Sequence, residues 1–424
     1  MTTPTYLGLR CEACGATAAA EAAAVCDACW GPLECAYDMA AVRASLAREP
    51  IGGRPRNVWR YRELLPVSPP AELASHVGFT PLVAAPRLAA RLGIAELWIK
   101  DEGACHPTLS FKDRLVAVAV ARALAMKMPV VACSSTGNLA AAVAARAAAC
   151  GLPAVVIVPE GVEAAKLAAV GAHGAQVVQI RGDYDRASRL SVHVADRYGW
   201  AVVNVNLRAF YTEGAKTIGY EIVEQRHGRL PGHVIVPVAG GGLFLKLGQS
   251  FHEARAAGIA TAGDPPALYA TQPEGCAPVV TAWRDGRDDV PPVRPRTMVH
   301  SLAVGDPADG PRALQLVRAS GGRADAPSDE EAVAGVRLLA ETEGLFVETA
   351  GGLVVAAAGR LARQGAFADG RAVVLVITGH GMKTVEVLPA GASIATIDGS
   401  AESFDTYWKE RGATAPTRSG TAAG

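Results

Sequence analysis

The chain has 424 residues, of which 50% are hydrophobic and 19% are charged. This composition allows a large buried core and disfavours disorder over most of the length. The 41 basic and 41 acidic side chains give a formal net charge of zero, so neither nucleic acid nor an anionic membrane is an expected partner. Any anionic ligand must therefore be held by a local site.

The first ten residues lack a basic stretch followed by an apolar run, so we expect no signal peptide. The longest apolar stretches, such as 115–126, are too short to span a bilayer or contain an arginine. Nine cysteines in an unexported chain argue against a disulfide framework. We therefore expect a cytoplasmic protein in which four cysteines are simply small buried residues: Cys105, Cys133, Cys150 and Cys276.

The first predicted element is a pair of Cys-x-x-Cys knuckles followed by Gly-Pro-Leu. Each knuckle can place two thiolates on one metal ion, and two knuckles complete a tetrahedron. Zinc bound in this way would be structural, because four thiolates leave no open coordination position. The alternative is a vestigial pair of knuckles that binds no metal. The four residues are Cys11, Cys14, Cys26 and Cys29.

A connector with polar and Pro/Gly-rich pieces follows at 43–74, and from about residue 78 β-branched runs alternate with Ala-rich helical stretches. This alternation predicts a mostly parallel sheet with helices on both faces, with ligands at the carboxyl ends of the strands. Ser328 and Glu331 predict a capping box for one helix. The predicted strands are 97–100, 130–133, 154–158, 176–180, 201–205, 234–238, 268–272 and 373–377. The predicted helices include 111–126, 139–150, 184–198, 244–257 and 328–343. The last stretch, 411–424, is rich in Thr, Ala and Gly and is expected to be a loose tail.

The segment 105–114 lies between the strand 97–100 and the helix 111–126. We expect Ser110 to cap this helix, which puts Lys112 in its first turn. The helix dipole disfavours a cation there, but the position suits an amine that must lose its charge to form an imine. The alternative is an ordinary solvated lysine.

A hydroxyl-rich segment, Ser134 to Asn138, follows the strand 130–133. Backbone N–H groups at a helix N-terminus and neighbouring hydroxyls can hold a carboxylate there. The alternative is an ordinary cluster of helix caps, although several caps in a row exceed what one helix needs.

Three consecutive glycines, within the segment Ala239 to Leu243, follow the strand 234–238. Glycines let backbone N–H groups close on a phosphate. A dinucleotide fingerprint fails because Leu245 stands where its third glycine is required, and no P-loop motif is present. The loop therefore favours a monophosphate, with a tight turn as the alternative.

The segment Thr378 to Gly381 follows the strand 373–377. A hydroxyl at a strand end can hydrogen-bond a ring nitrogen, whereas we interpret His380 as a turn residue. All four segments lie just beyond a strand or open the helix that follows it, and this shared position predicts one common site.

Together these segments resemble the fold-type II family of pyridoxal phosphate (PLP) enzymes, and within it the threonine synthases most closely. The resemblance runs from about residue 78 to 383 and includes the cysteine knuckles found in some members. The matching motifs are 59–66, 80–82, 98–103, 107–114, 213–217 and 378–381.

The resemblance implies two open, mostly parallel twisted sheets flanked by helices, with a small zinc-ribbon-like segment at 1–40. It further implies a large PLP-binding domain at 41–128 and 206–410, a small substrate domain at 129–205 and a flexible tail at 411–424. Family members are usually dimeric, so a homodimer acting on a small amino-acid substrate is expected.

The resemblance also implies the roles of the site residues. Lys112 carries PLP as a Schiff base and then acts as general base and acid at the substrate carbons. Thr378 faces the pyridine nitrogen and Asn138 lies near the 3′-oxygen. Ser135, Thr136 and Gly137 hold the substrate carboxylate or line its pocket, and Ser110 is a further substrate-binding residue. The PLP phosphate is wrapped by Gly240, Gly241 and Gly242, and Leu243 is a further cofactor-binding residue. Arg114, Lys216 and Arg208 are candidate contacts for an anionic substrate tail, with structural ion pairing as the alternative.

Three departures from the usual threonine synthase pattern bear on the substrate. Leu109 stands where glycine is usual, Leu139 stands where a polar residue is usual, and the glycine loop is similar to that of serine and threonine dehydratases. From the resemblance as a whole, we expect a threonine synthase-like lyase of amino-acid biosynthesis. In its most specific form this enzyme converts O-phosphohomoserine to threonine and phosphate.

Three alternatives stay open at this point. The chain could be a diverged β/γ-replacement enzyme of specialised metabolism, a serine/threonine dehydratase-like deaminase, or a non-catalytic zinc- and ligand-binding protein on an inherited fold. The intact Lys112, Asn138 and Thr378 argue against the last.

Overall fold

The computed structural model describes residues 3–18, 23, 25–70, 76–162, 164–182, 184–387 and 395–410. Two compact units divide the chain, one at 1–387 and the other at 388–424. The expected tail at 411–424 lies outside the described residues. None of the described helices is both long and apolar enough to cross a membrane.

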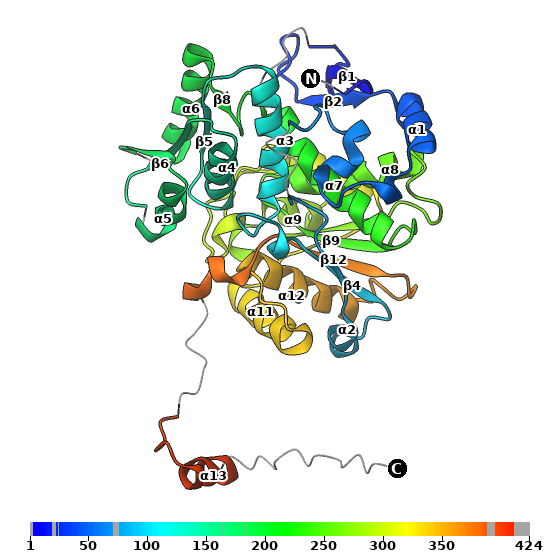
Figure 1. Ribbon diagram of the computed structural model, residues 1–424. Coiled ribbons are helices and arrows are strands. Elements are labelled where there is room, and N and C mark those ends of the chain that lie inside the picture. The colour runs from blue at the N-terminus through cyan, green and yellow to red at the C-terminus, as the bar shows by residue number, and fades with distance from the viewer. Residues whose placement is uncertain are drawn as a thin grey trace. The chain divides into compact units, whose positions relative to one another are not determined.

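A six-stranded sheet forms the centre of the first unit (Figure 1). Its strands run parallel except the edge strand β3, which pairs antiparallel with β4. The central strands are fully buried β-branched runs, as expected for a parallel sheet covered on both faces. In spatial order the strands are β11 (Ala324–Asp325), β10 (Ala267–Thr271), β9 (His233–Pro237), β12 (Val373–Ile377), β4 (Leu97–Asp101) and β3 (Leu82–Ala84).

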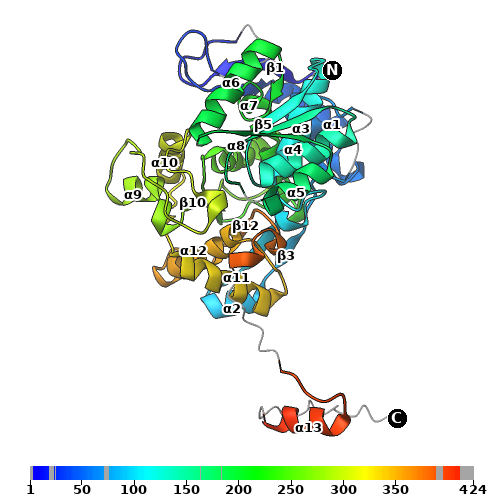
Figure 2. The same ribbon diagram turned by 90° about the vertical axis from the view of Figure 1, so that its left-hand side faces the viewer.

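Helices cover both faces of this sheet (Figure 2). Helix α12 (Thr349–Arg363) lies against β9 and β12 on one face, with α11 (Asp329–Glu343) packed on it, while α8 (Gly242–Ala256) and α10 (Gly310–Ala319) lie on the other face. The predicted capping box is confirmed: Ser328 Oγ accepts from the Glu331 N–H at 3.2 Å, and the Glu331 side chain accepts from the Ser328 N–H. The remaining helices around the sheet are α2 (Pro86–Leu92), α7 (Arg208–Gln225) and α9 (Pro278–Arg284).

A second sheet has four parallel strands, all within residues 131–202. In spatial order they are β7 (Gln176–Ile180), β6 (Ala154–Pro159), β5 (Val131–Ser134) and β8 (Ala201–Val202). The helices of this part are α4 (Asn138–Ala149), α5 (Ala164–Ala172) and α6 (Tyr184–Tyr198). Helix α3 (Lys112–Ala125) packs against both α4 and α7, and so connects the two sheet regions (Figure 1). The predicted fold class, two open and mostly parallel sheets flanked by helices, is confirmed.

An antiparallel hairpin of β1 (Tyr6–Cys11) and β2 (Leu33–Tyr37) precedes the sheets and packs against α7. Helix α1 (Met39–Arg48) follows it, capped by the Asp38 side chain, which accepts from two backbone N–H groups at 3.0 Å.

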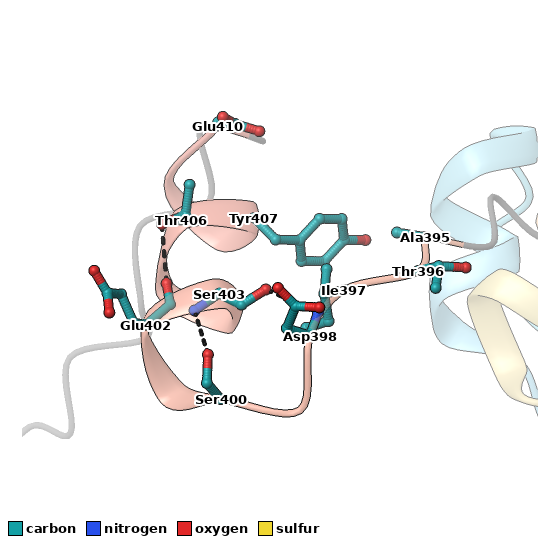
Figure 3. A pocket seen from close by; sticks show the side chains of 10 residues that line it. All are labelled: Ala395, Thr396, Ile397, Asp398, Ser400, Glu402, Ser403, Thr406, Tyr407 and Glu410. Atoms are coloured by element: carbon teal, nitrogen blue, oxygen red, sulfur yellow. Dashed lines mark hydrogen bonds between the residues drawn. The ribbon is translucent and has the colours of Figure 1, made fainter.

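The second unit contains α13 (Ala401–Glu410) and the extended residues before it. Figure 3 shows a hollow between them, in which the Ser403 N–H donates to Ser400 Oγ at 3.2 Å. The hollow is lined by Ala395, Thr396, Ile397, Asp398, Ser400, Glu402, Ser403, Thr406, Tyr407 and Glu410. None of these is a predicted site residue.

Two local predictions were wrong. The strand expected at 201–205 ends at Val202, because the next residues turn toward α7 and the Leu207 N–H bonds back to the Val202 carbonyl. Ser110 does not cap α3 with its side chain: Phe111 is the N-cap residue, and it is the Ser110 carbonyl that accepts from the Asp113 N–H.

Candidate active site

The four predicted segments all begin at the carboxyl ends of strands, as expected. The lysine segment follows β4, and Ser135 to Asn138 follow β5. The glycine loop follows β9, and Thr378 follows β12. Backbone contacts join the first and last of these segments, because the Phe111 N–H donates to the Thr378 carbonyl at 3.0 Å and Ser110 pairs with Gly379.

Lys112 is the first residue of α3, and the residue as a whole is half-buried. Its Nζ lies 2.7 Å from the Tyr211 hydroxyl and 4.6 Å from the centre of the Phe111 ring. Burial lowers the pKa of Lys112 to about 8, although the negative charge of Glu348 acts in the opposite direction. A substantial fraction of the amine is therefore neutral near physiological pH, as a nucleophile or general base requires.

Glu348 brings two predicted residues together. Its buried carboxylate accepts from Thr378 Oγ1 at 2.8 Å and from Asn138 Nδ2 at 3.1 Å. Thr378 ends β12 and Asn138 begins α4, so this one carboxylate joins the two sheet regions at the site. Its negative charge also acts on Lys112.

The backbone explains how Glu348 reaches this position. Glu348 is the N-cap residue of α12, but its side chain does not cap that helix. Its N–H donates to the Gly379 carbonyl at 3.0 Å. A β-carbon on Gly379 would lie only 2.7–2.8 Å from the Glu348 carboxylate, so glycine is required for this approach.

The predicted anion cradle opens α4. Ser135 Oγ accepts from the Gly137 N–H at 3.3 Å, and a β-carbon on Gly137 would meet no atom within 4 Å. Ser135 and Thr136 are half-buried and Gly137 is exposed. The first N–H groups of α4 have no partners within the helix, so this end of α4 can receive a carboxylate.

The glycine loop opens α8 in the same way. Gly241 is the N-cap residue with φ +99°, and a β-carbon there would lie 2.7 Å from Cβ of Asp309. Gly240 faces open space, and Leu243 is half-buried. A glycine-rich turn at a helix N-terminus matches a phosphate in both shape and electrostatics.

Ser110 provides a direct test of whether these residues fit PLP with an amino-acid substrate. Its side chain is fully buried, and its Oγ has no hydrogen-bond partner among the described residues. A buried hydroxyl without a partner is costly, so its place beside Lys112 fits a polar ligand. The free cradle at α4, the glycine loop at α8 and the partly neutral amine fit the same ligand pair.

The prediction for Arg114 needs correction. Its guanidinium is fully buried and donates to Glu102, at 2.5 and 2.8 Å, and to Glu221. It also donates to Thr80 and Thr217, both at 3.0 Å. With its donors occupied by these groups, Arg114 belongs to a structural ion-pair network and has no N–H to offer a substrate.

The other two candidate cations are also in ion pairs. Lys216 is fully buried and pairs with Glu213 at 2.6 Å and with Glu253 at 3.1 Å. Arg208 pairs with Asp309 at 2.5 Å, close to the glycine loop.

The four N-terminal cysteines converge as the spacing predicts. Their sulfur atoms all lie within 4.8 Å of one another, with Cys11 3.5 Å from Cys29 and Cys14 3.8 Å from Cys26. Of the cysteines expected to be small buried residues, Cys105, Cys133 and Cys276 are buried and Cys150 is half-buried.

Two site residues were not found from the sequence. Tyr211 lies on α7, 99 positions from Lys112, and no local motif distinguishes it. Glu348 lies 30 positions from Thr378 and 210 from Asn138. Its one sequence signal is an acidic residue directly before an apolar helix, which is also the pattern of an ordinary helix start.

Comparison with known proteins gives consistent matches. The family model described as "Pyridoxal-phosphate dependent enzyme" matches residues 73–379. A threonine synthase from Methanocaldococcus jannaschii is 37% identical over 88% of this chain and 92% of its own length. A threonine synthase from Methanosarcina acetivorans is 36% identical, again over 88% of this chain and 92% of its own length.

Solved structures share the fold. The structure of maize serine racemase superposes with a TM-score of 0.60 at 21% identity, covering 80% of this chain and 96% of that one. At this level of identity the match concerns the fold alone.

Proposed function

Because the chain belongs to the pyridoxal-phosphate-dependent enzymes, and within them to the threonine synthase family, we propose that it converts O-phosphohomoserine to threonine and phosphate. The observation that supports this most directly is the pair of curated threonine synthases aligned over 88% of the chain. Leu109 and Leu139 depart from the usual pattern of this family. On this proposal, both leucines are compatible with its substrate.

In this proposal the chain's own residues bind, orient and move protons. Gly240 to Leu243 would hold the cofactor phosphate, Thr378 would face the ring nitrogen, and Asn138 would lie near the 3′-oxygen. The substrate carboxylate lies at the α4 N-terminus with Ser135, Thr136, Gly137 and the unpartnered hydroxyl of Ser110. When bound, PLP supplies the electron sink that stabilises negative charge at the substrate carbons.

Lys112 is the attachment point of the cofactor and the group that moves protons at the substrate carbons. Its lowered pKa, about 8, supports both roles, because the amine can lose and regain a proton near neutral pH. Tyr211 holds Nζ by a 2.7 Å hydrogen bond once the amine is free.

The phosphate of the substrate needs a cation, and we assign this contact to Lys383. This half-buried lysine ends the loop after Thr378 and makes no ion pair within the described part of the chain. Burial lowers its pKa, while the nearby charges of Glu348 and Asp113 raise it. Since Arg114 and Lys216 are fully paired, Lys383 is the better candidate.

The Lys383 assignment predicts a specific kinetic effect. Lys383→Met should raise KM for O-phosphohomoserine about tenfold to a hundredfold, as expected for the loss of a charge-assisted contact of about 1.5–3 kcal/mol. The cofactor absorbance should not change. Lys127→Met, at an exposed position just beyond the C-terminal end of α3, is the matched control. An unchanged KM would refute the assignment.

The test of the function itself is a two-product assay. Purified protein loaded with PLP is incubated with O-phosphohomoserine, and phosphate and threonine are both measured. Equal release of the two products is expected, and Lys112→Ala should abolish it together with the absorbance of lysine-bound cofactor. No turnover by normally loaded protein would refute the proposal and favour a diverged β/γ-replacement enzyme; ammonia released from serine or threonine would favour a deaminase.

We also propose that Cys11, Cys14, Cys26 and Cys29 bind one structural zinc ion. A tetrahedral site with zinc–sulfur bonds of about 2.3 Å places its sulfurs about 3.8 Å apart, close to the 3.5 and 3.8 Å separations here. Nine cysteines free of disulfides suit a reducing compartment, so we place the enzyme in the cytoplasm, as a homodimer in keeping with the family resemblance.

A further inference from the structure

The hydrogen bond between Thr378 and Glu348 has a fixed direction. A carboxylate only accepts, so the Thr378 hydroxyl must donate its single proton to Glu348 Oε1, 2.8 Å away. The same reasoning orients Asn138, whose Nδ2 faces Glu348 Oε2 at 3.1 Å. Each carboxylate oxygen thereby has a hydrogen-bond donor. The residue Glu348 is buried, with an exposed fraction of only 2%.

Reversing the hydroxyl would be unfavourable. If Thr378 donated elsewhere, Glu348 Oε1 would lose its hydroxyl donor inside the protein, where an unsatisfied charged acceptor is costly. Gly379 keeps the carboxylate in contact, because its missing β-carbon leaves the space that Glu348 fills. Thr378 therefore presents only lone pairs to any other neighbour.

From this we infer that Glu348 acts through Thr378 as a positioning residue that keeps the pyridine nitrogen of the bound cofactor protonated. The inference rests on one part of the proposed function, the cofactor placement that puts that nitrogen at Thr378. An unprotonated nitrogen would set its lone pair against those of the threonine oxygen, whereas a ring N–H donates to that oxygen. A hydroxyl facing the ring nitrogen is otherwise expected to donate to it, so Glu348 reverses the sense of this contact.

The charges around the site are compatible with a cationic ring. Glu348 contacts Thr378, the residue proposed to face that ring, and its negative charge also acts on two lysines, Lys112 and Lys383. A protonated ring withdraws electrons more strongly, which suits an elimination and replacement reaction that must stabilise negative charge at several substrate carbons.

The test is a direct observation of the ring nitrogen. The protein is loaded with PLP labelled with ¹⁵N in the ring, and its ¹⁵N chemical shift is recorded without substrate. Wild type should show the shift of a protonated pyridine. Glu348→Gln should move it to the unprotonated range, because the glutamine amide can donate to Thr378 and turn the hydroxyl toward the ring. Glu341→Gln, an exposed glutamate on α11, is the matched control and should not move it.

A second pair of variants covers the case in which Glu348→Gln fails to fold. Thr378→Ser keeps the hydroxyl and should keep the ring protonated, whereas Thr378→Val removes it and should not. An unprotonated ring in wild type, or a protonated ring in Glu348→Gln or Thr378→Val, overturns the inference. A protonated wild-type ring in a protein that makes no threonine refutes the proposed function and leaves this inference standing.

Discussion

At the scale of single residues, burial lowers the pKa of the Lys112 amine, which is the reactive group of the candidate site. The Lys112 amine lies between the Phe111 ring and the Tyr211 hydroxyl. Desolvation disfavours its charged form and brings its pKa to about 8. Tyr211 contributes in a different way, because its hydroxyl fixes where the amine points.

This distinction predicts that pH and Tyr211 affect separate steps. Only the neutral amine attacks the cofactor aldehyde, so attachment of PLP to the cofactor-free protein should accelerate as pH rises, with a midpoint near 8. Tyr211→Phe should keep this midpoint, because burial is unchanged. It should nevertheless lower kcat about tenfold to a hundredfold, because the released amine loses its position. Stopped-flow absorbance measures the first effect and steady-state kinetics the second.

The matched control is Tyr198→Phe, which removes a hydroxyl from an exposed tyrosine on α6. An attachment rate that did not vary between pH 7 and 9 would contradict the role of burial. A kcat unaffected by Tyr211→Phe would contradict the role of its hydroxyl.

Sequence reasoning identified those residues of the candidate site that belong to local motifs and missed those whose partners lie far away in the chain. Lys112, Asn138 and Thr378 each belong to a short segment whose chemistry can be read directly. Glu348 gains its role only when α12, β12 and α4 meet, and Arg114 loses its expected role only because Glu221, 107 positions away, takes its donors. Partners at such separations carry no signal in one sequence.

At the scale of elements, the turn from β12 into the site depends on Gly379. This residue pairs with Ser110 on one side and accepts from the Glu348 N–H on the other. It therefore fixes the distance between the lysine segment, the end of β12 and the start of α12.

Gly379→Ala tests this packing. The added β-carbon would lie 2.7–2.8 Å from a buried carboxylate, so we expect a loss of about 1–3 kcal/mol of stability and weaker retention of PLP. Urea unfolding and cofactor absorbance after dialysis measure these effects. Gly53→Ala is the control, since a β-carbon there meets no atom within 4 Å. Equal stability of the two variants would show that Glu348 can move away without cost.

Most strands were predictable because each central strand is a short run rich in β-branched residues, with turn-forming or polar residues at both ends. The strand β12 matches its prediction at both boundaries. The short edge strands β3 and β11 were not predicted, since three and two residues respectively carry too little pattern. The expected strand at 201–205 has the same composition as the others, but only two of its residues find a partner strand.

At the scale of the whole molecule, a chain of charged contacts runs from the β1–β2 hairpin, beside which the four N-terminal cysteines converge, to the glycine loop. Arg312 on α10 pairs with Glu12, between the first two cysteines, and with Glu34 on β2 at 2.9 Å. It also binds Asp309 at 3.0 Å. The Asp309 N–H donates to the Gly240 carbonyl at 3.0 Å, so the hairpin and the proposed phosphate site share one set of contacts.

A second contact strengthens the connection. Lys246 on α8, the helix that the glycine loop opens, pairs with Glu34 and with Glu213 at 2.5 Å. The opposite charges of Glu213 and Glu34 raise the pKa of Lys246 despite its burial. Since Glu34 lies on β2, a displacement of this strand would take one partner from Lys246 and one from Arg312.

This coupling predicts that the proposed zinc ion, far from the candidate active site, controls cofactor affinity. Removing zinc with a chelator, or Cys14→Ser, should release Glu12 and Glu34 from fixed positions and loosen the glycine loop through Asp309. A coupling free energy of about 1–3 kcal/mol would weaken PLP binding about 5- to 150-fold. Metal content and PLP titration by fluorescence measure the two ends of the chain of contacts, and Cys150→Ser, outside the cluster, serves as the control.

The intermediate contact can be cut separately. Arg312→Met leaves the four thiolates intact but breaks the pairs with Glu12, Glu34 and Asp309. If the coupling runs through this residue, the variant should retain zinc and bind PLP more weakly. Its PLP affinity should then no longer change when the chelator is added. A variant that stayed equally sensitive to zinc removal would show that the hairpin acts on the site by another route. Unchanged PLP affinity after zinc loss in wild type would show that the hairpin and the site are energetically independent.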